Sequence, residues 1–260
     1  MLATSIALSW RIVIIFVAGV VAGISNAIAG GGTFVTFPAL LALGIPSLQA
    51  NVSSSVGVVP SNFGGVRGFR RELALHKTLF RELIPTCALG SVVGTALLFL
   101  GSESTFRSVV PWLIGVATIL FALAPRLVKL LSKVRQHAEG HHIRRRSLFV
   151  GVFFGSIYGG YFGAGLGIIL FAILALTLPF EIFELQGLRV ALGLVINTVA
   201  AVIFVIRGHL AVVAVLVLLV GTLIGGWLGT ILIRRLSPRV VRTLVIAIGI
   251  VTTVKLAIGN

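Results

Sequence analysis

The chain has 260 residues, of which 58% are hydrophobic and only 10% are charged. A soluble domain carries about 25% charged residues, so this composition excludes a soluble globular protein and predicts an all-α, polytopic protein of the cell membrane. The formal net charge is +15, but the basic residues lie in short stretches between apolar segments, and no aromatic–basic motif accompanies them. We therefore expect no nucleic-acid partner, and we expect the basic stretches to set the orientation of the chain in the bilayer.

The first apolar stretch contains no Asp, Glu, Lys or Arg between Ile12 and Val66. Because a membrane helix needs about 20 apolar residues, the borders of the apolar runs predict five helical segments in this half of the chain. Their expected bounds are 11–29, 33–44, 47–68, 78–100 and 106–124. The second of these segments is too short to cross the hydrocarbon alone, and it directly follows a break at Gly30, Gly31 and Gly32.

A basic stretch at 125–146 ends the first half, and we expect it to be a cytoplasmic linker. The second half again begins with an uncharged stretch, 147–180, and this stretch also contains a glycine break, at Gly163, Gly165 and Gly167. Five further helical segments are expected here, at 147–164, 166–177, 182–206, 209–233 and 239–257. As in the first half, the second segment is too short to span the membrane by itself.

The two halves match in the order and spacing of their glycines. The matched positions lie 131–133 residues apart and are Gly19/Gly151, Gly23/Gly155, Gly30/Gly163, Gly32/Gly165, Gly90/Gly221 and Gly94/Gly225. A loop rich in Lys and Arg follows the third segment of the first half but the fourth segment of the second, and such loops stay in the cytoplasm. We therefore predict two inverted repeats, 1–124 and 147–260, with eight to ten segments in total.

A glycine break in a membrane helix leaves backbone N–H and C=O groups that hydrocarbon cannot satisfy, so the break must line a protein-enclosed cavity. The helix that restarts at Thr33 presents N–H groups and the positive end of its dipole, which is an environment for an anion. The alternative is that the glycines only allow close helix packing, but three in succession exceed that need. The predicted substrate-binding residues at this break are Asn26, Gly30, Gly31, Gly32 and Thr33.

Polar side chains gather in the third segment of each half, and the candidates for substrate binding are Asn51, Ser54, Asn62, Gln186, Arg189 and Asn197. An arginine inside a membrane segment is costly and indicates a functional site, and its planar fork suits the oxygen atoms of a carboxylate, sulfonate or sulfite. The alternatives are that Arg189 pairs with Glu184 or reaches the interface, and that the serines bond to their own helix. Tyr158 and Tyr161 flank the second break as further candidates, either as hydroxyl donors or gates, or as interface tyrosines.

One stretch carries a likeness to a known family. It contains Gly30-Gly31-Gly32-Thr33-Phe34, Pro38, Leu43-Gly44-Ile45-Pro46, Ala50-Asn51 and Ser53-Ser54-Ser55, and the second half is similar from Gly155 to Pro179. With these motifs the chain resembles the TauE/SafE family of sulfite and organosulfonate exporters, also called the toluene-sulfonate uptake permease family. The resemblance covers essentially the whole chain. It implies a small sulfur-containing anion, such as sulfite, a sulfonate or sulfoacetate, as the substrate.

Together these features predict a secondary transporter that moves a small anion by alternating access. An anion channel on the same scaffold is the alternative. No enzyme is expected, because no span holds a histidine-rich or carboxylate-rich motif and no Walker-type loop is present. His137, His141 and His142 of the linker lack ligand partners at metal-binding spacing, so we expect no cofactor. Two glycine packing motifs, each with three intervening residues, are Gly90/Gly94 and Gly221/Gly225. They fit helix contacts within one subunit, with a homodimer as the alternative.

Overall fold

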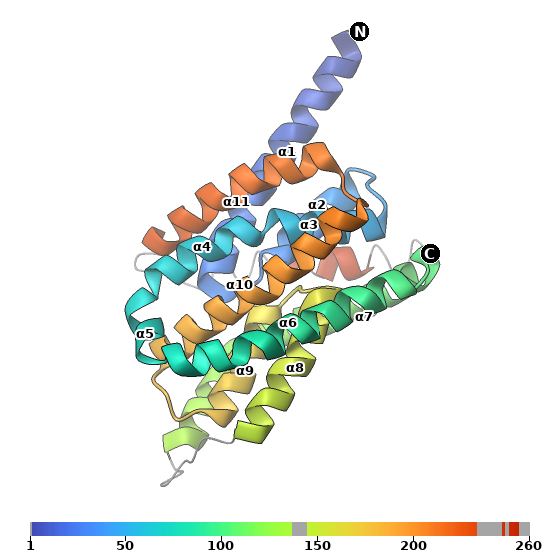
Figure 1. The fold of residues 1–260 in the computed structure, drawn as a ribbon. Helices are drawn as coiled ribbons and strands as arrows, with labels where there is room; N and C mark the ends of the chain where they lie inside the picture. Colours follow the sequence, from blue (N-terminus) through green and yellow to red (C-terminus); the bar gives the residue numbers. More distant parts are fainter. Residues whose placement is uncertain (1, 137–144, 233–245, 248–249, 255–260) are drawn as a thin grey trace.

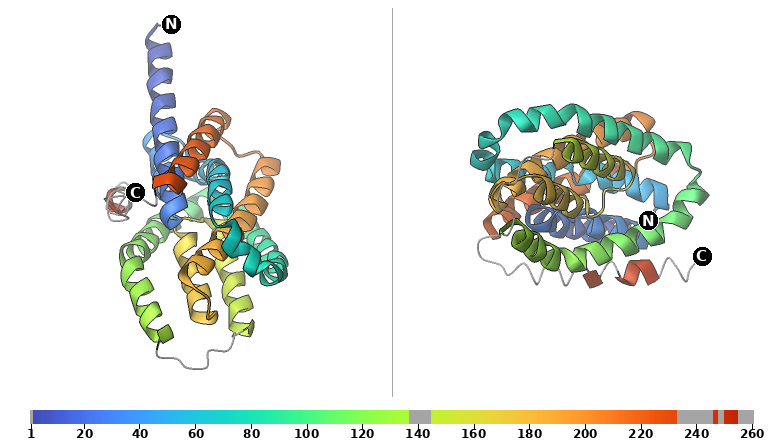
Figure 2. Two further views of the ribbon diagram at one scale, coloured as in Figure 1. Left: turned by 90° about the vertical axis from the view of Figure 1, so that its left-hand side faces the viewer. Right: turned by 90° about the horizontal axis from the view of Figure 1, so that it is seen from below.

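The computed structural model describes residues 2–136, 145–232, 246–247 and 250–254, and this described part of the chain is all-helical (Figure 1). The helices are α1 (Leu2–Ala29), α2 (Thr33–Ala42), α3 (Ser47–Gly57), α4 (Val59–Gly68), α5 (Arg70–Leu75), α6 (Lys77–Leu100), α7 (Glu103–Gln136), α8 (Arg145–Tyr161), α9 (Leu166–Thr177), α10 (Ile182–Arg207) and α11 (Val212–Leu232). They form one bundle, and the N-terminal part of α1 extends beyond it (Figure 2).

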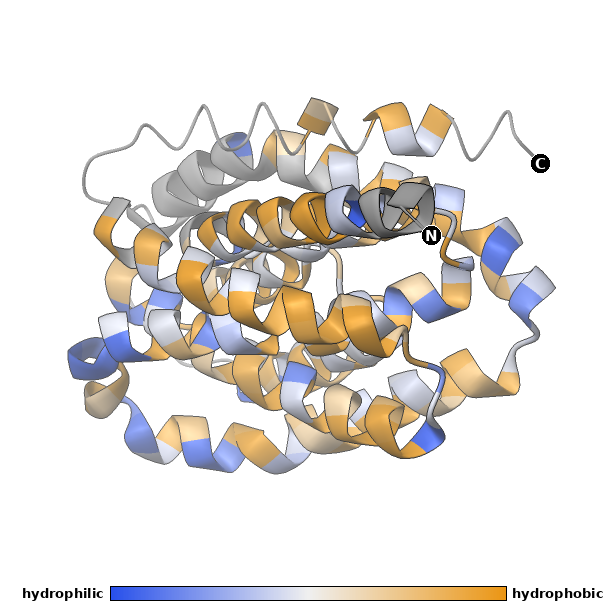
Figure 3. Cartoon of the chain, turned by 90° about the horizontal axis from the view of Figure 1, so that it is seen from above, coloured by the Kyte–Doolittle hydropathy of each residue, from blue (hydrophilic) through white to orange (hydrophobic). Residues whose placement is uncertain are grey.

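The described helices have the length and surface of a membrane protein. By length and composition, α6, α10, Ser9–Ala27 of α1 and Val212–Gly229 of α11 can each cross a bilayer, whereas the apolar α2 and α9 are shorter. Many large apolar side chains are exposed, and Trp112 and Ile206 are 76% and 78% exposed. Hydrophobic residues predominate along most of the described helices (Figure 3). Such a surface is unfavourable in water and suits contact with lipid. The predicted all-helical membrane protein is therefore confirmed.

Glycines bring two pairs of helices into backbone contact. Helix α1 packs along α11, and α6 packs along α8. A Cβ atom on Gly23 would lie 2.4 Å from the carbonyl oxygen of Thr222, and one on Gly94 would lie 2.1 Å from that of Ile157. Only glycine permits this approach, so both predicted glycine motifs make contacts within one chain. In each pair, the first helix of one half packs on the fourth segment of the other half, while the inversion of the halves stays a prediction.

Three predicted segments have different bounds in the structure. The segment expected at 47–68 is divided into α3 and α4 at Val58, because Pro60 has no N–H to donate and its ring clashes with the carbonyl four residues earlier. Helix α7 continues to Gln136, so the first part of the predicted linker is helical. Helix α1 begins at Leu2, well before the expected start at residue 11.

Some predictions fall largely outside the described residues. These include the linker histidines His137, His141 and His142, and most of the last predicted segment, of which 246–247 and 250–254 are described as helical. The division into repeats with a linker between them therefore stays a prediction.

Candidate functional site

Both predicted glycine breaks interrupt helices in the structure. Helix α1 ends at Ala29 and α2 begins at Thr33, while α8 ends at Tyr161 and α9 begins at Leu166. Gly30 has φ +77°, and Gly163 and Gly165 have φ +74° and +76°. Side chains with a Cβ atom rarely adopt this left-handed conformation. Glycine at these three positions thus ends one helix and lets the chain turn into the next.

The two breaks meet inside the bundle. A Cβ atom on Gly30 would lie 2.8 Å from Cα of Gly167, and one on Gly167 would lie 2.8 Å from Cα of Gly30. The same two Cβ atoms would lie 2.4 Å and 2.7 Å from Nη1 of Arg189. The guanidinium of α10 is therefore held where the two interrupted helices touch, at a point where neither neighbour can carry a side chain.

A small cavity of about 30 Å³ lies at this crossing. Six of its lining residues are predicted substrate-binding residues, namely Asn26, Gly30, Thr33, Asn62, Arg189 and Asn197. The other lining residues are Val58, Gly163, Leu166, Gly167, Val190 and Gly193. The cavity thus combines both helix breaks with the polar side chains of α4 and α10, which are distant in the sequence.

Among the described residues, Arg189 is the only charged one that lines this cavity, and it is 4% exposed. Within the described residues no carboxylate pairs with it, and its Nε lies buried without a hydrogen-bond partner. The predicted alternative partner, Glu184, instead accepts a hydrogen bond of 2.9 Å from the backbone N–H of Glu181 and lies 3.2 Å from Nε2 of His76. A buried cation without a counter-charge is unfavourable. The site is therefore electrostatically suited to an anion.

Further donors surround the cavity. Thr33 lies at the first position of α2, and it is 6% exposed. The backbone N–H groups of Phe34 and Val35 donate to the carbonyls of Gly31 and Gly32. Of the first three N–H groups of α2, that of Thr33 therefore stays as the candidate donor to an anion. Asn62 of α4 is 7% exposed, and its Nδ2 is buried without a partner.

The remaining candidates lie outside the cavity lining and have other contacts. The Tyr158 hydroxyl donates to the carbonyl of Ala164, and Nδ2 of Asn51 donates to the carbonyl of Tyr161 over 3.0 Å. Both bonds satisfy backbone groups of the second break, which is a structural role. Ser54 bonds to the Thr36 hydroxyl, linking α3 to α2.

Four predicted residues remain, and they also lie outside the cavity lining. The ring of Tyr161 packs on Phe106, with the ring centroids 5.9 Å apart. Gln186 lies one turn before Arg189, and its buried Oε1 has no hydrogen-bond partner. Gly31 and Gly32 belong to the first break but do not line the cavity.

Sequence reasoning missed Gly193, which lies in the middle of α10 and lines the cavity. It is buried, yet a Cβ atom there would meet no atom within 4 Å. The glycine therefore serves no close helix contact, and the space beside it belongs to the cavity. A glycine inside a long apolar helix at a position that no packing motif explains is the signal for such a residue.

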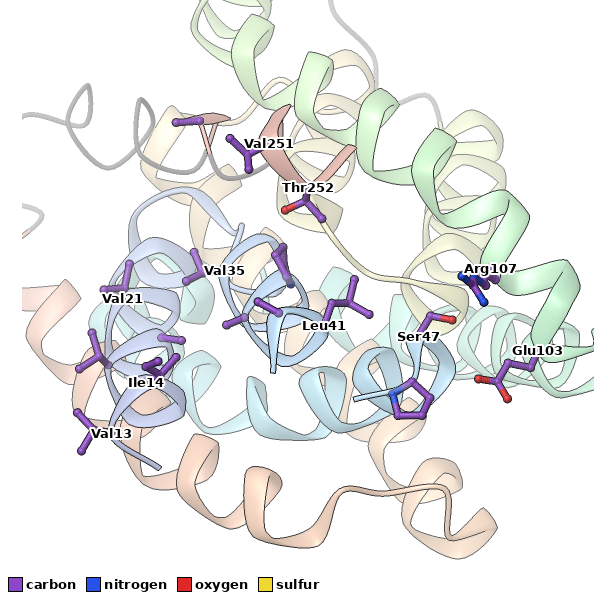
Figure 4. Close-up of a pocket in the computed structure, with 17 residues that line it drawn as sticks. Val13, Ile14, Val21, Val35, Leu41, Ser47, Glu103, Arg107, Val251 and Thr252 are labelled. Carbon is purple, nitrogen blue, oxygen red and sulfur yellow. The ribbon is translucent and has the colours of Figure 1, made fainter. Parts of the chain in front are cut away.

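A second, much larger cavity of about 1060 Å³ lies between α1, α2 and the start of α7 (Figure 4). Apolar side chains such as Val13, Val35 and Leu41 line most of it, with Glu103 and Arg107 at one end. Arg107 is already engaged in an interaction. The described part of these walls resembles a lipid-facing crevice, and it lacks the unpartnered donors that a small hydrophilic anion requires. We therefore place the candidate site in the small cavity at the helix breaks.

Comparison with known proteins agrees with this architecture. The sequence matches the family model described as "Sulfite exporter TauE/SafE" over residues 15–256. The chain belongs to this family. It is a multi-pass membrane transporter and not an enzyme.

Curated relatives of this chain cover nearly the same length. A probable membrane transporter protein of Haemophilus influenzae is 26% identical over 243 residues, which is 94% of this chain and 93% of the relative. The probable membrane transporter protein YfcA of Escherichia coli is 24% identical over 251 residues, covering 94% and 88% of the two chains. ORF9 of Sinorhizobium sp, also named a probable membrane transporter protein, is 24% identical over 93% of this chain and 90% of the relative. No solved structure matches the chain.

Proposed function

We propose that this TauE/SafE protein is a secondary transporter for a small sulfur-containing anion, such as sulfite, a sulfonate or sulfoacetate, and that the cavity at the helix breaks is its binding site. One observation carries the proposal, namely the buried guanidinium of Arg189 between two glycines, without a carboxylate partner among the described residues. An anion in the cavity supplies the missing counter-charge. The planar guanidinium offers two parallel hydrogen bonds to a pair of anion oxygens.

The arrangement of the breaks supports alternating access. In transporters built from inverted repeats, substrates bind where discontinuous helices meet near the middle of the bilayer. Here the α1–α2 and α8–α9 breaks contribute Gly30 and Gly167 to one contact. Rocking of one half against the other would open this contact to one side of the membrane at a time.

An anion channel is the competing proposal. A cavity of about 30 Å³ suits one tightly held, dehydrated group better than a column of hydrated ions. We therefore favour the transporter, in which the two halves of the chain move relative to each other.

Counterflow exchange tests this proposal. Purified protein in liposomes loaded with unlabelled sulfite should accumulate labelled sulfite transiently, whereas acetate inside should drive little accumulation. The same protein in detergent should gain thermal stability from sulfite, taurine or sulfoacetate, because a ligand that binds only the folded state stabilises it. A steady single-channel conductance without counterflow would support the channel, and no response to any sulfur oxyanion would contradict the proposed substrate class.

Gly193 provides a prediction in which stability and transport change in opposite directions. Gly193→Ala should raise the free energy of unfolding by about 0.5–1 kcal/mol, because alanine is favoured over glycine in a helix interior. The added methyl group enters the cavity, so sulfite affinity should fall, and Gly193→Val should lower it further. Thermal unfolding and sulfite titration measure the two effects.

Gly115→Ala in α7 is the matched control for Gly193→Ala. Among the described residues, its Cβ atom would meet only Cγ2 of Thr253, at an ordinary 3.6 Å, and Gly115 is not among the residues that line the cavity. The control should show a similar gain in stability with unchanged affinity. Equal sulfite affinity in Gly193→Val and the wild type would remove this part of the cavity from the binding site.

A further inference from the structure

A chain of side-chain hydrogen bonds lies behind the cavity and ends at Asn62. The Ser61 hydroxyl donates to the carbonyl of Val58, where α3 gives way to α4. Nδ2 of Asn26 lies 2.7 Å from Oγ of Ser61 and 3.1 Å from Oδ1 of Asn62. Ser61 is 1% exposed and does not line the cavity, whereas Asn26 and Asn62 do.

Hydrogen-bonding chemistry fixes the direction of this chain. A backbone carbonyl can only accept, so the single hydroxyl proton of Ser61 must point to Val58. The Ser61 oxygen is then left as an acceptor toward Asn26, which must present its amide nitrogen there. The second proton of the same nitrogen meets the side chain of Asn62, which must answer with its carbonyl oxygen. The side-chain amides of Asn26 and Asn62 cannot flip without placing two donors or two acceptors against each other.

This series of hydrogen bonds fixes the orientation of Asn62, its last residue. Because the oxygen of Asn62 faces Asn26, its Nδ2 points away from Asn26, and that nitrogen is buried without a partner. A buried donor without a partner is costly. Nδ2 of Asn62 and Nε of Arg189 are thus two unpartnered donors on residues that line the same cavity.

We infer that Asn26 and Ser61 are positioning residues that hold Asn62 as a hydrogen-bond donor, and thereby make the cavity selective for a ligand whose facing oxygens all accept hydrogen bonds. This inference rests on the proposed function, and it adds the specificity element of that site. A deprotonated oxyanion can accept hydrogen bonds from both Nδ2 of Asn62 and Nε of Arg189. A ligand that points a hydroxyl or amine proton at Nδ2 of Asn62 would instead place two donors against each other.

A double-mutant cycle on anion affinity tests the inference. The Kd values of sulfite, taurine and sulfoacetate are measured by calorimetry for the wild type, Ser61→Ala, Asn62→Ala and the double variant. Asn62→Ala should weaken binding about 10- to 100-fold, the loss of one hydrogen bond to a charged group. Ser61→Ala should weaken it roughly threefold to tenfold, because the amide of Asn62 is no longer held as a donor. The double variant should bind no more weakly than Asn62→Ala alone, because Ser61 acts only through Asn62.

Two further variants complete the experiment. Ser156→Ala removes another buried hydroxyl that donates to its own helix, over 2.6 Å to the carbonyl of Val152, and should leave affinity unchanged. Asn26→Ala repeats the cycle with Asn62→Ala if Ser61→Ala does not fold, and it should show the same lack of additivity.

The outcomes separate the inference from the proposed function. Effects of Ser61→Ala and Asn62→Ala that multiply, or wild-type affinity in Ser61→Ala, would overturn the positioning role. If Arg189→Gln loses binding at the same time, the proposed function stands without it. If the wild-type protein binds none of the three anions, both are overturned.

Discussion

Arg189→Gln is expected to raise the Kd of the transported anion about 100-fold or more, because a hydrogen-bonded charge at a buried site contributes about 2–5 kcal/mol. Gln keeps a polar group and much of the side-chain length, but it removes the one charge that the described residues place along the cavity. Arg189→Lys keeps the charge and loses the planar fork, so its affinity should be intermediate. Calorimetric titration and counterflow in liposomes measure the loss.

The stability of the unliganded protein distinguishes a role of Arg189 in anion binding from a role in stabilising the fold. Arg189 has no carboxylate partner among the described residues, so its removal leaves no orphaned acid. The Tm of unliganded Arg189→Gln should therefore equal or exceed that of the wild type, because the cost of burying a charge is relieved. The anion-dependent rise in Tm should disappear.

Arg207→Gln is the matched control for Arg189→Gln, because it lies on the same helix. Arg207 is at the exposed C-terminal end of α10, with its guanidinium carbon 5.5 Å from the centre of the Phe99 ring. The Arg207→Gln variant should bind the anion with the affinity of the wild type. Tight anion binding by Arg189→Gln would exclude Arg189 from the site.

Gly30→Ala should abolish transport while the protein still inserts into the membrane. Two costs combine at this position. The left-handed backbone at φ +77° disfavours alanine by about 1–2 kcal/mol, and the new methyl carbon would lie 2.4 Å from Nη1 of Arg189 and 2.8 Å from Cα of Gly167. The arginine side chain can move away, but the backbone of α9 can yield only by separating the two breaks. The guanidinium should therefore leave its position, and transport and anion affinity should fall together.

Gly44→Ala separates the two costs. Gly44 has φ +80° and a Cβ atom there would meet no atom within 4 Å, so this variant carries the backbone strain without the clash. It should lose a similar amount of stability and retain transport. Gly167→Ala carries the clash within a helix and should behave as Gly30→Ala does. If Gly30→Ala transports as well as Gly44→Ala, the contact between the breaks is not needed for function.

Much of the candidate site could be predicted from the sequence, because polar residues are costly in apolar segments. Arg189, Asn62 and Asn26 stand out for this reason, and the structure brings them to one cavity. The same reasoning also selects Tyr158 and Asn51, whose donors satisfy carbonyls of the second break. A sequence shows that a polar group needs a partner, but not whether that partner is the backbone or a ligand.

The glycines show the opposite limitation. Gly94 and Gly225 belong to packing motifs that can be read from their spacing, and they make the expected helix contacts. Gly193 belongs to no such motif and Gly167 to the predicted second break, and the sequence shows neither that Gly193 borders empty space nor that Gly167 touches the opposite break. What lies beside a glycine depends on helices far along the chain, so no local pattern distinguishes these uses.

The amino-acid sequence by itself determined that the chain is helical, lies in a membrane and is interrupted at two glycine clusters, because hydrocarbon excludes charge and demands internally satisfied backbone groups over every apolar run. Only the tertiary structure decided that the two interruptions touch, that Glu184 is engaged with His76 instead of Arg189, and that Ser61 and Asn26 fix the orientation of Asn62. These facts depend on the distances between residues of different helices. Such distances follow from how the whole bundle packs, and no single segment encodes them.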